Sequence, residues 1–325
     1  HGFDKVDLRR RNLIQSDDMP FTNGVGVTYD SGDYTAAMDA ALHEGDWNGF
    51  EARKAESAAR GLCRGRGIAN YIEVTSGIPR ERAEITVADD GYIDLVVGTM
   101  SSGQGHETSF PQLLCEWLEV PFEKIRFVVN DTNRVSVGGG SHSGRSMRLV
   151  SIAAGEAVEA LLEKGKAIAA HAMQTPIDEI EYAEGAFHAP GGGSLDLWAA
   201  AKAGESETEL PNLEGIGDIV NRVGGYPYGA HACEVEVDPE TGHVDILEWT
   251  AVDDVGVAVN PLILHGQAHG AAVQGIGQAM LEAIEYDPES AQLLTGSFMD
   301  YAMPRADNMP PFKTVVTEVP ASSHA

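Results

Sequence analysis

The sequence predicts an α+β fold of two mixed subdomains, in which helices pack on small, largely antiparallel or mixed sheets. Three observations predict it. Helix-like and strand-like segments follow one another along 325 residues without a repeat of fixed period. A glycine-rich loop stands between a strand and a helix twice. After a weakly patterned stretch, apolar and charged residues alternate at 233–237, as in a half-buried strand.

Helices open the chain, and strands follow. Helices are expected over residues 4–12, 32–42 and 47–60, and Gly61 suits the end of the third. Residues 19–30, rich in Gly, Thr and Asp, are expected to form a linker. Strands are expected over 68–74, 82–88 and 92–97, and the Asp-Asp-Gly turn at 89–91 joins the last two.

The later elements follow the same signals. We expect a helix over 108–118, a strand over 124–129 and a long helix that ends near Met173. A hairpin around Glu184-Gly185 and a short helix near Trp198 are expected within 175–225. The last elements are strands over 233–237 and 244–252, a glycine-rich helix from about 261 to 283, two short strands and a strand over 315–319.

Composition limits the possible partners. Fifty acidic residues against 22 basic ones give a formal net charge of −28, which repels nucleic acid. No run of eighteen apolar residues occurs, so no membrane span is expected. Cys63, Cys115 and Cys233 lie far apart without a CxxC pair, so neither a zinc nor an iron–sulfur site is indicated. Such sparse thiols fit a reducing cytoplasm, and we expect all three to be small buried apolar side chains.

The first candidate binding segment is Ser-Ser-Gly-Gln-Gly-His-Glu-Thr at 101–108. Glycine lets the backbone approach a ligand closely, and the helix that follows offers free amides and the positive end of its dipole. Gln104 adds a donor and an acceptor that never ionise. The segment suits an anionic or strongly polar ligand. A zinc-protease motif is excluded, because Phe110 stands where the second histidine of HExxH is required.

The second candidate segment is Gly-Gly-Gly-Ser-His-Ser-Gly-Arg-Ser at 138–146. Its hydroxyls, its arginine and its flexible backbone could hold a phosphate or the edge of a nucleobase. It matches neither the GxGxxG fingerprint nor a P-loop, so neither a dinucleotide fold nor a nucleotide triphosphatase is indicated. The alternative is a Ser/Gly surface loop with an exposed arginine.

The third candidate is the glycine-punctuated helix that carries Gln267 and Gln274. Glycine costs about 1 kcal/mol relative to alanine inside a helix, so several of them indicate a packing or binding reason. His265 and His269 stand four residues apart, but no third metal ligand is evident, and no metal site is predicted. Asp253-Asp254 could be paired carboxylates, although a solvated turn after a strand is the simpler interpretation.

These segments, in this order, resemble the molybdenum-binding large subunit of the xanthine oxidase family, and above all its carbon-monoxide-dehydrogenase-like bacterial members. The resemblance covers essentially the whole chain and rests on seven segments: 2–12, 28–34, 104–108, 139–146, 252–256, 260–261 and 298–305.

The resemblance implies an oxidoreductase that oxidises or hydroxylates a small molecule (carbon monoxide, an aldehyde or an N-heterocycle) with water as the oxygen source. It implies molybdenum on molybdopterin, as the cytosine dinucleotide, and iron–sulfur and FAD subunits as partners. By the same resemblance, the cofactor-binding residues are Gln104, Gly105, His106, Glu107, Thr108, Ser141, Ser143, Gly144, Arg145, Ser146, Gln267 and Gln274.

The resemblance also predicts how the chain divides. Residues 1–62 are expected to be the helical tail of a preceding molybdopterin-binding domain with a linker, and 63–325 a second such domain that stops before its active-site turn. The family's general-base glutamate is then expected after Ala325, so no catalytic residue is predicted here. The alternative to the enzyme portion is a non-catalytic, cofactor-free structural fragment or binding module.

Overall fold

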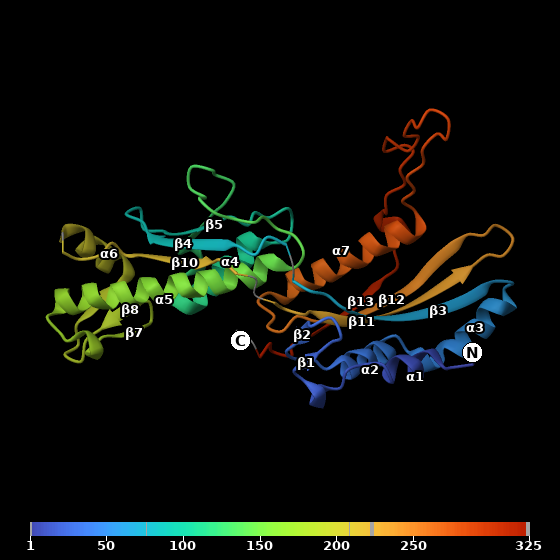
Figure 1. Ribbon diagram of the computed structural model, residues 1–325, viewed down its shortest axis with the longest axis horizontal. Helices are drawn as coiled ribbons and strands as arrows, with labels where there is room; N and C mark the ends of the chain where they lie inside the picture. Colours follow the sequence, from blue (N-terminus) through green and yellow to red (C-terminus); the bar gives the residue numbers. More distant parts are fainter. Residues whose placement is uncertain (1, 76, 208, 222–223, 323–325) are drawn as a thin grey trace. The chain divides into compact units, whose positions relative to one another are not determined.

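The computed structural model describes residues 2–75, 77–207, 209–221 and 224–322, and the chain forms two compact units (Figure 1). Unit 1 contains the residues up to Glu73 and those from Tyr226 onward, and unit 2 contains the residues from Val74 to Gly225. The expected boundary after residue 62 therefore falls inside unit 1, because the strand that starts at Cys63 pairs with a strand from the second half of the chain.

Unit 1 is built on a four-stranded mixed sheet. Its strand order is β13 (Phe312–Thr317), β12 (Val244–Asp254), β11 (Tyr228–Val237) and β3 (Cys63–Ile72). Only the β12–β13 pair is parallel. The helices are α1 (Lys5–Arg10), α2 (Tyr34–Glu44), α3 (Phe50–Ala59) and α7 (Pro261–Met280), with short 3-10 turns at Ser16–Asp18, Trp47–Gly49 and Ala306–Asn308.

The sheet of unit 1 is covered on both faces. Helix α2 packs Met38 and its alanines against Ile68, Tyr228 and Val252. Val315 of β13 packs against the α2 cluster. Successive residues of a strand point to opposite faces of the sheet, so Thr314 points to the other face. Thr314 instead meets helix α7, where His265 Nδ1 lies 2.8 Å from its hydroxyl (Figure 1).

Unit 2 holds a second mixed sheet of four strands, in the order β10 (Glu214–Ile219), β4 (Glu81–Val87), β5 (Ile93–Val97) and β6 (Ile125–Val128). Helices α4 (His106–Leu118), α5 (Arg145–Met173) and α6 (Leu197–Ser206) belong to this unit. A small sheet of β7 (Glu181–Ala183), β8 (Ala186–His188) and β9 (Ser194–Asp196) completes it, with 3-10 turns at Phe122–Lys124 and Ile177–Glu179.

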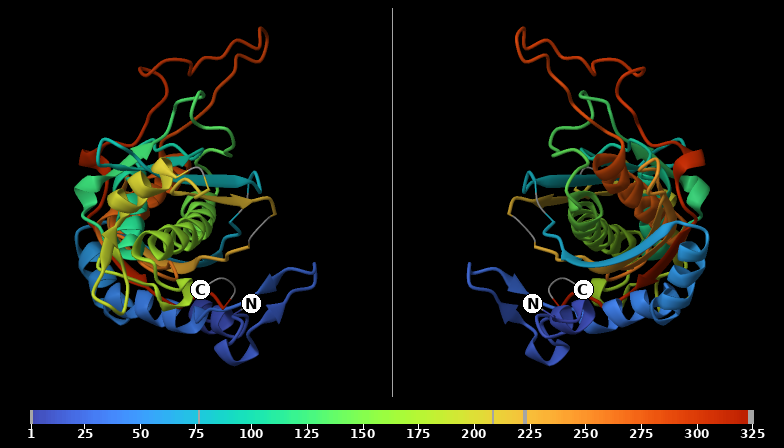
Figure 2. Two further views of the ribbon diagram at one scale, coloured as in Figure 1. Left: turned by 90° about the vertical axis from the view of Figure 1, so that its left-hand side faces the viewer. Right: turned by 90° about the vertical axis from the view of Figure 1, so that its right-hand side faces the viewer.

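Helix α5 runs along the sheet of unit 2 and is seen nearly end-on in Figure 2. Its apolar residues form one buried face, which includes Leu149, Ala153 and Leu161. Strand β10 presents Gly215 and Gly217 to this helix, and a Cβ on either glycine would overlap a backbone carbonyl of α5. The glycines therefore set how closely the helix approaches the sheet, which fixes the start of α5 for the loop that precedes it.

The predicted fold class is confirmed, and most elements lie where the sequence placed them. Strand β3 starts earlier than expected, and helix α7 ends at Met280. The expected linker at 19–30 contains a short hairpin of β1 (Phe21–Thr22) and β2 (Thr28–Tyr29). The two short strands expected before β13 reduce to a single bridge between Tyr286 and Leu293. Strand β10 was not anticipated, because its glycines interrupt the apolar pattern.

The cysteine prediction was wrong. Cys63 is exposed, and Cys115 and Cys233 are only partly buried. Cys63 is the first residue of β3 and pairs with the last residue of β11, so it stands at the end of the ladder rather than in the core.

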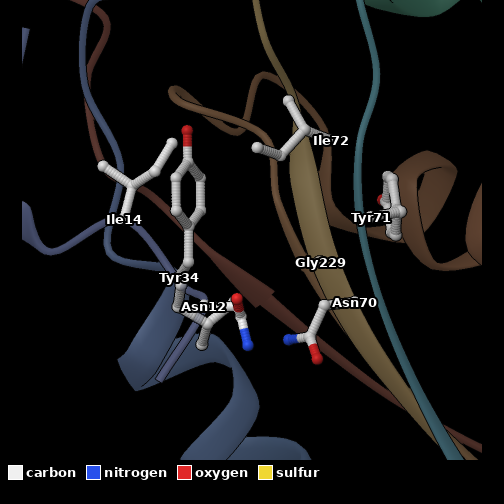
Figure 3. Close-up of a pocket in the computed structure, with 8 residues that line it drawn as sticks. Asn12, Ile14, Tyr34, Asn70, Tyr71, Ile72 and Gly229 are labelled. Atoms are coloured by element: carbon white, nitrogen blue, oxygen red, sulfur yellow. The ribbon is translucent and has the colours of Figure 1, made fainter. Parts of the chain in front are cut away.

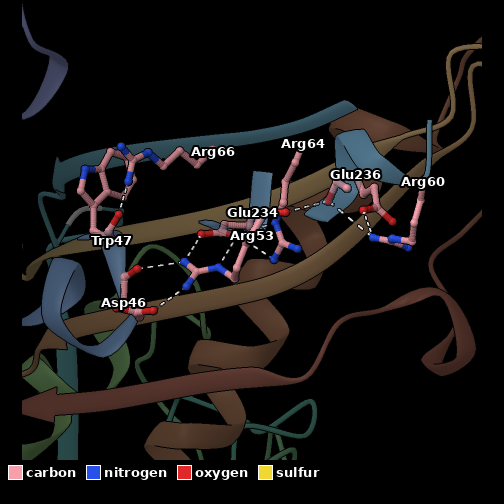
Figure 4. Close-up of polar contacts among 9 residues, drawn as sticks. Asp46, Trp47, Arg53, Arg60, Arg64, Arg66, Glu234 and Glu236 are labelled. Carbon is pink, nitrogen blue, oxygen red and sulfur yellow. Dashed lines mark hydrogen bonds and ion pairs between the residues drawn. The ribbon is translucent and has the colours of Figure 1, made fainter. Parts of the chain in front are cut away.

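A cluster of ion pairs joins helix α3 to the sheet of unit 1 (Figure 4). Glu234 on β11 is buried and accepts from Arg53 at 2.5 Å and from Arg64 at 2.8 Å. Burial by itself raises the pKa of Glu234, but the hydrogen bonds from the two arginines outweigh it, and the pKa lies below its usual value. Beside this cluster, Arg66 stacks on the Trp47 ring at 4.0 Å. The ion pairs of Glu234 thus hold helix α3 against strand β11.

Candidate functional site

The first predicted loop connects β5 to α4 in unit 2. Gly105 occupies the N-cap position of α4 with a φ of +74°, in the left-handed region that glycine adopts without strain. No side chain caps this helix start. The first amides of an α-helix have no partner within the helix, so this terminus presents free N–H groups and the positive end of the dipole.

The second predicted loop leads into α5 in the same way. Gly144 is the N-cap residue with a φ of +67°, and again no side chain caps the helix. Ser143 and Gly144 are exposed, and Ser141 and Ser146 are half-buried. Helices α4 and α5 therefore begin in the same way, with a glycine at the N-cap position in place of a capping side chain.

The two loops lie against each other. A Cβ on Gly98 would overlap the Cα of Gly138, so the two backbones cross in direct contact. Ser141 donates to the Met100 carbonyl at 2.5 Å, and Ser146 donates to the Ser141 hydroxyl at 3.1 Å. The structure thus brings the first two predicted segments together within one unit.

His106 links the two loops at the base of α4. It is buried, and its Nδ1 lies 3.4 Å from Ser141 Oγ. Burial lowers the pKa of His106 below its usual value, so the imidazole is neutral at neutral pH. The neutral imidazole thus lies beside a serine hydroxyl of the second loop.

The remaining residues of the first segment lie at the surface. Gln104 is half-buried and accepts from the amide of Ser102 through its carbonyl oxygen. Glu107 and Thr108 are exposed on the first turn of α4. The amide nitrogen of Gln104 is therefore the part of this side chain that can meet a ligand.

Arg145 lies in the core rather than at the surface. Its relative exposure is 1%, and it pairs with Glu81, whose exposure is 0%, at 3.0 Å. The other guanidinium contacts are to the carbonyls of Ile78, Arg80 and Gly140 and to the Thr99 hydroxyl. All three nitrogens thus have protein partners, and this position does not favour the predicted direct contact with a phosphate.

Gln267 and Gln274 belong to unit 1, where both are exposed on helix α7. Asn260 caps this helix through its side chain, and Pro261 occupies the first turn. Gly266, Gly270 and Gly275 have open space where a Cβ would stand. No close neighbour among the described residues therefore requires these three glycines.

The histidines of α7 contact residues of β13. His265 bonds to Thr314, and His269 stacks on Phe312 with ring centroids 5.2 Å apart. Across the described ranges, no three His, Cys, Asp or Glu side chains are grouped as metal ligands.

Asp253 and Asp254 do not form the solvated turn that the sequence suggested. Both belong to β12, where Asp253 accepts from Tyr71 at 2.7 Å and lies 2.8 Å from His231 Nε2. Asp254 is buried and accepts from Thr317. Gly229 makes this possible, because a Cβ there would stand 2.6 Å from the Asp253 carboxylate and 2.7 Å from the Tyr71 ring.

A pocket of about 270 Å³ opens in unit 1, and none of the predicted site residues lines it (Figure 3). Its walls come from the segment after α1, from α2 and from β3, with Ile14 and Ile72 on either side of Tyr34 (Figure 3). Burial raises the pKa of Tyr34 to about 12, so its hydroxyl stays neutral at ordinary pH.

Two groups of the loop region were missed by the sequence analysis, Glu81 and Thr99. Glu81 opens a strand whose other residues alternate in the usual way, and Thr99 follows a buried strand. Neither residue stands in a recognisable sequence pattern, because their role depends on Arg145, which is far along the chain.

Comparison with known proteins shows the family of the chain. Residues 40–310 match the molybdopterin cofactor-binding domain family. The chain is 33% identical to the gamma subunit of the 6-hydroxypseudooxynicotine dehydrogenase complex of Paenarthrobacter nicotinovorans, over 98% of this chain and 41% of that protein. It is 31% identical to the carbon monoxide dehydrogenase large chain of Afipia carboxidovorans, over 99% of this chain and 42% of that one.

Solved structures give the same result. The crystal structure of a Cu,Mo-CO dehydrogenase matches with a TM-score of 0.89 and 29% identity, over 99% of this chain and 43% of that chain. Quinoline 2-oxidoreductase from Pseudomonas putida 86 matches with a TM-score of 0.87 and 28% identity, over the same shares. The chain spans about two fifths of the length of these relatives.

The fold and the sequence together define a molybdopterin-binding protein. The chain belongs to the molybdopterin cofactor-binding domain family, within the large subunits of the molybdenum hydroxylases of the xanthine oxidase family. The described residues fit an anionic pterin cofactor, since two uncapped helix starts, serine hydroxyls and a neutral imidazole lie together in unit 2. In the described part of the chain, no helix combines the length and apolar character that a membrane span requires.

Proposed function

We propose that this chain forms the cofactor-binding part of a molybdenum hydroxylase and holds molybdopterin in its cytosine dinucleotide form. One observation carries the proposal: helices α4 and α5 both start at uncapped glycines, and Ser141 joins the loops that precede them. Helix starts of this kind favour phosphate and other anionic groups. Membership of the family supports molybdopterin as the anionic group. The cytosine dinucleotide form is proposed from the resemblance to the bacterial members of the family.

The proposed contacts follow from the resemblance to the family, and the exposure of each group limits which of them are direct. Ser143, Gly144 and Ser146, at the start of α5, would meet the phosphates or the nucleotide. Gln104 to Thr108, at the start of α4, would meet the pterin and its sulfur-bearing end. Gln267 and Gln274, exposed on α7 of unit 1, are proposed as cofactor-binding residues from the resemblance alone. Arg145 would act through the loop it supports, because its nitrogens are already occupied.

The cofactor, when bound, supplies a molybdenum centre for two-electron oxidation with water as the oxygen source. The residues of this chain would bind and orient the cofactor mainly through backbone amides, serine hydroxyls and the amide of Gln104, with Glu107 as the one acidic side chain among the proposed contacts. His106, buried and neutral, can hold a fixed hydrogen bond without exchanging charge at neutral pH. We assign no proton-transfer step to the proposed site residues.

The remaining parts of the proposal come from the resemblance to the family, from the names of the relatives and, for the location, from the sparse cysteines. Their names include a carbon monoxide dehydrogenase large chain and a nicotine 6-hydroxylase large subunit. We infer a small-molecule substrate, which could be carbon monoxide, an aldehyde or an N-heterocycle. We also infer iron–sulfur and FAD subunits as electron-accepting partners, and a cytoplasmic location. The expected general-base glutamate after Ala325 lies outside the described residues.

Elemental analysis with cofactor release tests the proposal. The chain is purified from a host that makes the cytosine-dinucleotide pterin, and a host unable to make the cofactor provides the matched control. We expect near-stoichiometric molybdenum, and cytidine monophosphate after acid hydrolysis, only in the first sample. A folded chain without molybdenum would instead be a structural module, and molybdenum released with a different nucleotide would correct the cofactor's form.

A further inference from the structure

The two loops of unit 2 cross where neither has a side chain. Gly98 follows β5, and Gly138 opens the second loop, and their backbones touch. Contact between two glycines fixes a distance but not an orientation, because glycine has the widest choice of backbone conformations. Some other group must hold the loops in one arrangement.

Glu81 lies directly beneath the first loop. It is the first residue of β4, and its carboxylate is fully buried. One oxygen accepts from the Gly98 amide at 3.2 Å, and the other accepts from the Thr99 hydroxyl at 2.5 Å. The carboxylate therefore holds the end of β5 at the point where the first loop begins.

Arg145 connects this carboxylate to the second loop. Its Nη2 lies 3.0 Å from Glu81, and its Nη1 donates to the Gly140 carbonyl at 2.5 Å and to Thr99 at 3.2 Å. A Cβ on Gly139 would stand 2.6 Å from the guanidinium carbon, so the planar group lies flat under this loop. The three side chains thus bond to both loops at once.

The electrostatics of this arrangement need both charged groups, Glu81 and Arg145. Arg145 is the first residue of α5, where the positive end of the helix dipole disfavours a cation. Glu81 offsets that charge in an environment without solvent. Lysine could replace the charge of arginine but not its planar set of five donors.

We propose that Glu81, Thr99 and Arg145 are positioning residues that fix how the two loops meet, and so shape the cofactor site. The inference rests on the proposed function for its purpose, but the effect on the loops can be measured without any cofactor. It changes the predicted role of Arg145 from a ligand of the phosphate to a support of the loop that binds it.

The test compares Arg145→Lys with the wild-type chain by ¹⁵N relaxation, and Thr99→Val is a second variant in case the first does not fold. Arg126→Lys is the matched control, because Arg126 also donates to a buried carboxylate of unit 2, that of Asp94, at 2.6 Å. We expect order parameters of the 139–144 amides to fall from about 0.85 to below about 0.6 in the first two variants only. Amides of strands β4 and β5 should keep their values.

Cofactor content is the second readout. In the cofactor-producing host, Arg145→Lys should lose about tenfold or more of its molybdenum, as when groups that orient a ligand shell are removed. Unchanged order parameters in both loop variants would overturn the inference, even if the wild type is loaded. Loosened loops in a chain that never holds molybdenum would contradict the proposed function instead, and leave the positioning of the loops standing.

Discussion

Each unit of this protein buries a carboxylate that is paired with arginine, and the two pairs have different surroundings. In unit 1, Glu234 meets Arg53 and Arg64, whose side chains keep 23% and 11% of their exposure. In unit 2, the Glu81 and Arg145 side chains are 0% and 1% exposed. The partners of the first pair are mainly other side chains, whereas those of Arg145 are mainly carbonyls of irregular backbone.

The difference indicates what each pair does. Side-chain partners on a helix and a strand hold two regular elements together, and water can solvate the arginines if the carboxylate is lost. Carbonyl groups in loops have no backbone N–H partners from a helix or sheet. The guanidinium of Arg145 supplies these donors instead. A buried ion pair is weak evidence for stability in itself, but removing one partner leaves an unpaired charge. Removing the carboxylate should therefore lower the free energy of unfolding more in unit 2 than in unit 1.

The largest expected effect comes from Glu81→Ala. It leaves the Arg145 charge buried without its partner and should lower the free energy of unfolding by about 3–5 kcal/mol. Glu234→Ala should cost less, about 1–3 kcal/mol, because Arg53 and Arg64 can reach water. Urea denaturation of both variants measures the two losses. Equal losses, or a larger loss for Glu234→Ala, would contradict the contrast between the two units.

The next effect comes from the glycine contact between the loops. In Gly138→Ala the new methyl group would stand 2.7 Å from the Gly98 carbonyl oxygen, so one loop must move. We expect a loss of about 1–3 kcal/mol in the free energy of unfolding, as for overpacked sites. Gly155→Ala in α5 is the control, since its Cβ has open space and should stabilise the helix by about 0.5–1 kcal/mol. Two variants of equal stability would show that the loops do not touch.

A smaller effect depends on pH. The folded-state pKa of His106 lies below the unfolded value of about 6.5, because the ring is buried. Between those two values the unfolded state binds more protons, so stability falls as the pH is lowered through this window. His106→Gln removes this contribution, so the thermal midpoint of the variant should depend less on pH below about pH 6.5. A variant that keeps the wild-type pH profile would show that His106 is not the group responsible.

The smallest effect is expected on α7. Gln274 is exposed, so Gln274→Ala should change the free energy of unfolding by no more than about 0.5 kcal/mol. If the side chain contacts the cofactor as proposed, molybdenum content should fall while the thermal midpoint stays constant. Gln278→Ala, at another exposed position of the same helix, is the control. Equal molybdenum in both variants would remove Gln274 from the site.

The sequence predicted the features whose signals lie in neighbouring residues. A strand, a glycine-rich loop and a helix start follow one another in order, so both loops and their helices could be read directly. The fold class followed from the same patterns. Strand β10 was missed because Gly215 and Gly217 serve the close approach of α5, which no neighbouring residue reveals.

What remained unpredicted depends on contacts between distant residues. An arginine after a Ser/Gly loop is usually exposed, and only the position of Glu81 shows that Arg145 is buried. Asp253 and Asp254 have the composition of a turn, yet Gly229 opens the sheet so that Tyr71 and His231 reach Asp253. In both cases the partner lies on another strand, and the charge alone gives no sign of it.

Amide chemical shifts of the cofactor-loaded and cofactor-free chain test the central claim most directly. We expect the largest differences on residues 104–108 and 141–146, where α4 and α5 begin, and smaller ones along β4 and β5. Unchanged shifts at both helix starts, in a chain that contains molybdenum and pterin, would contradict it and place the cofactor elsewhere.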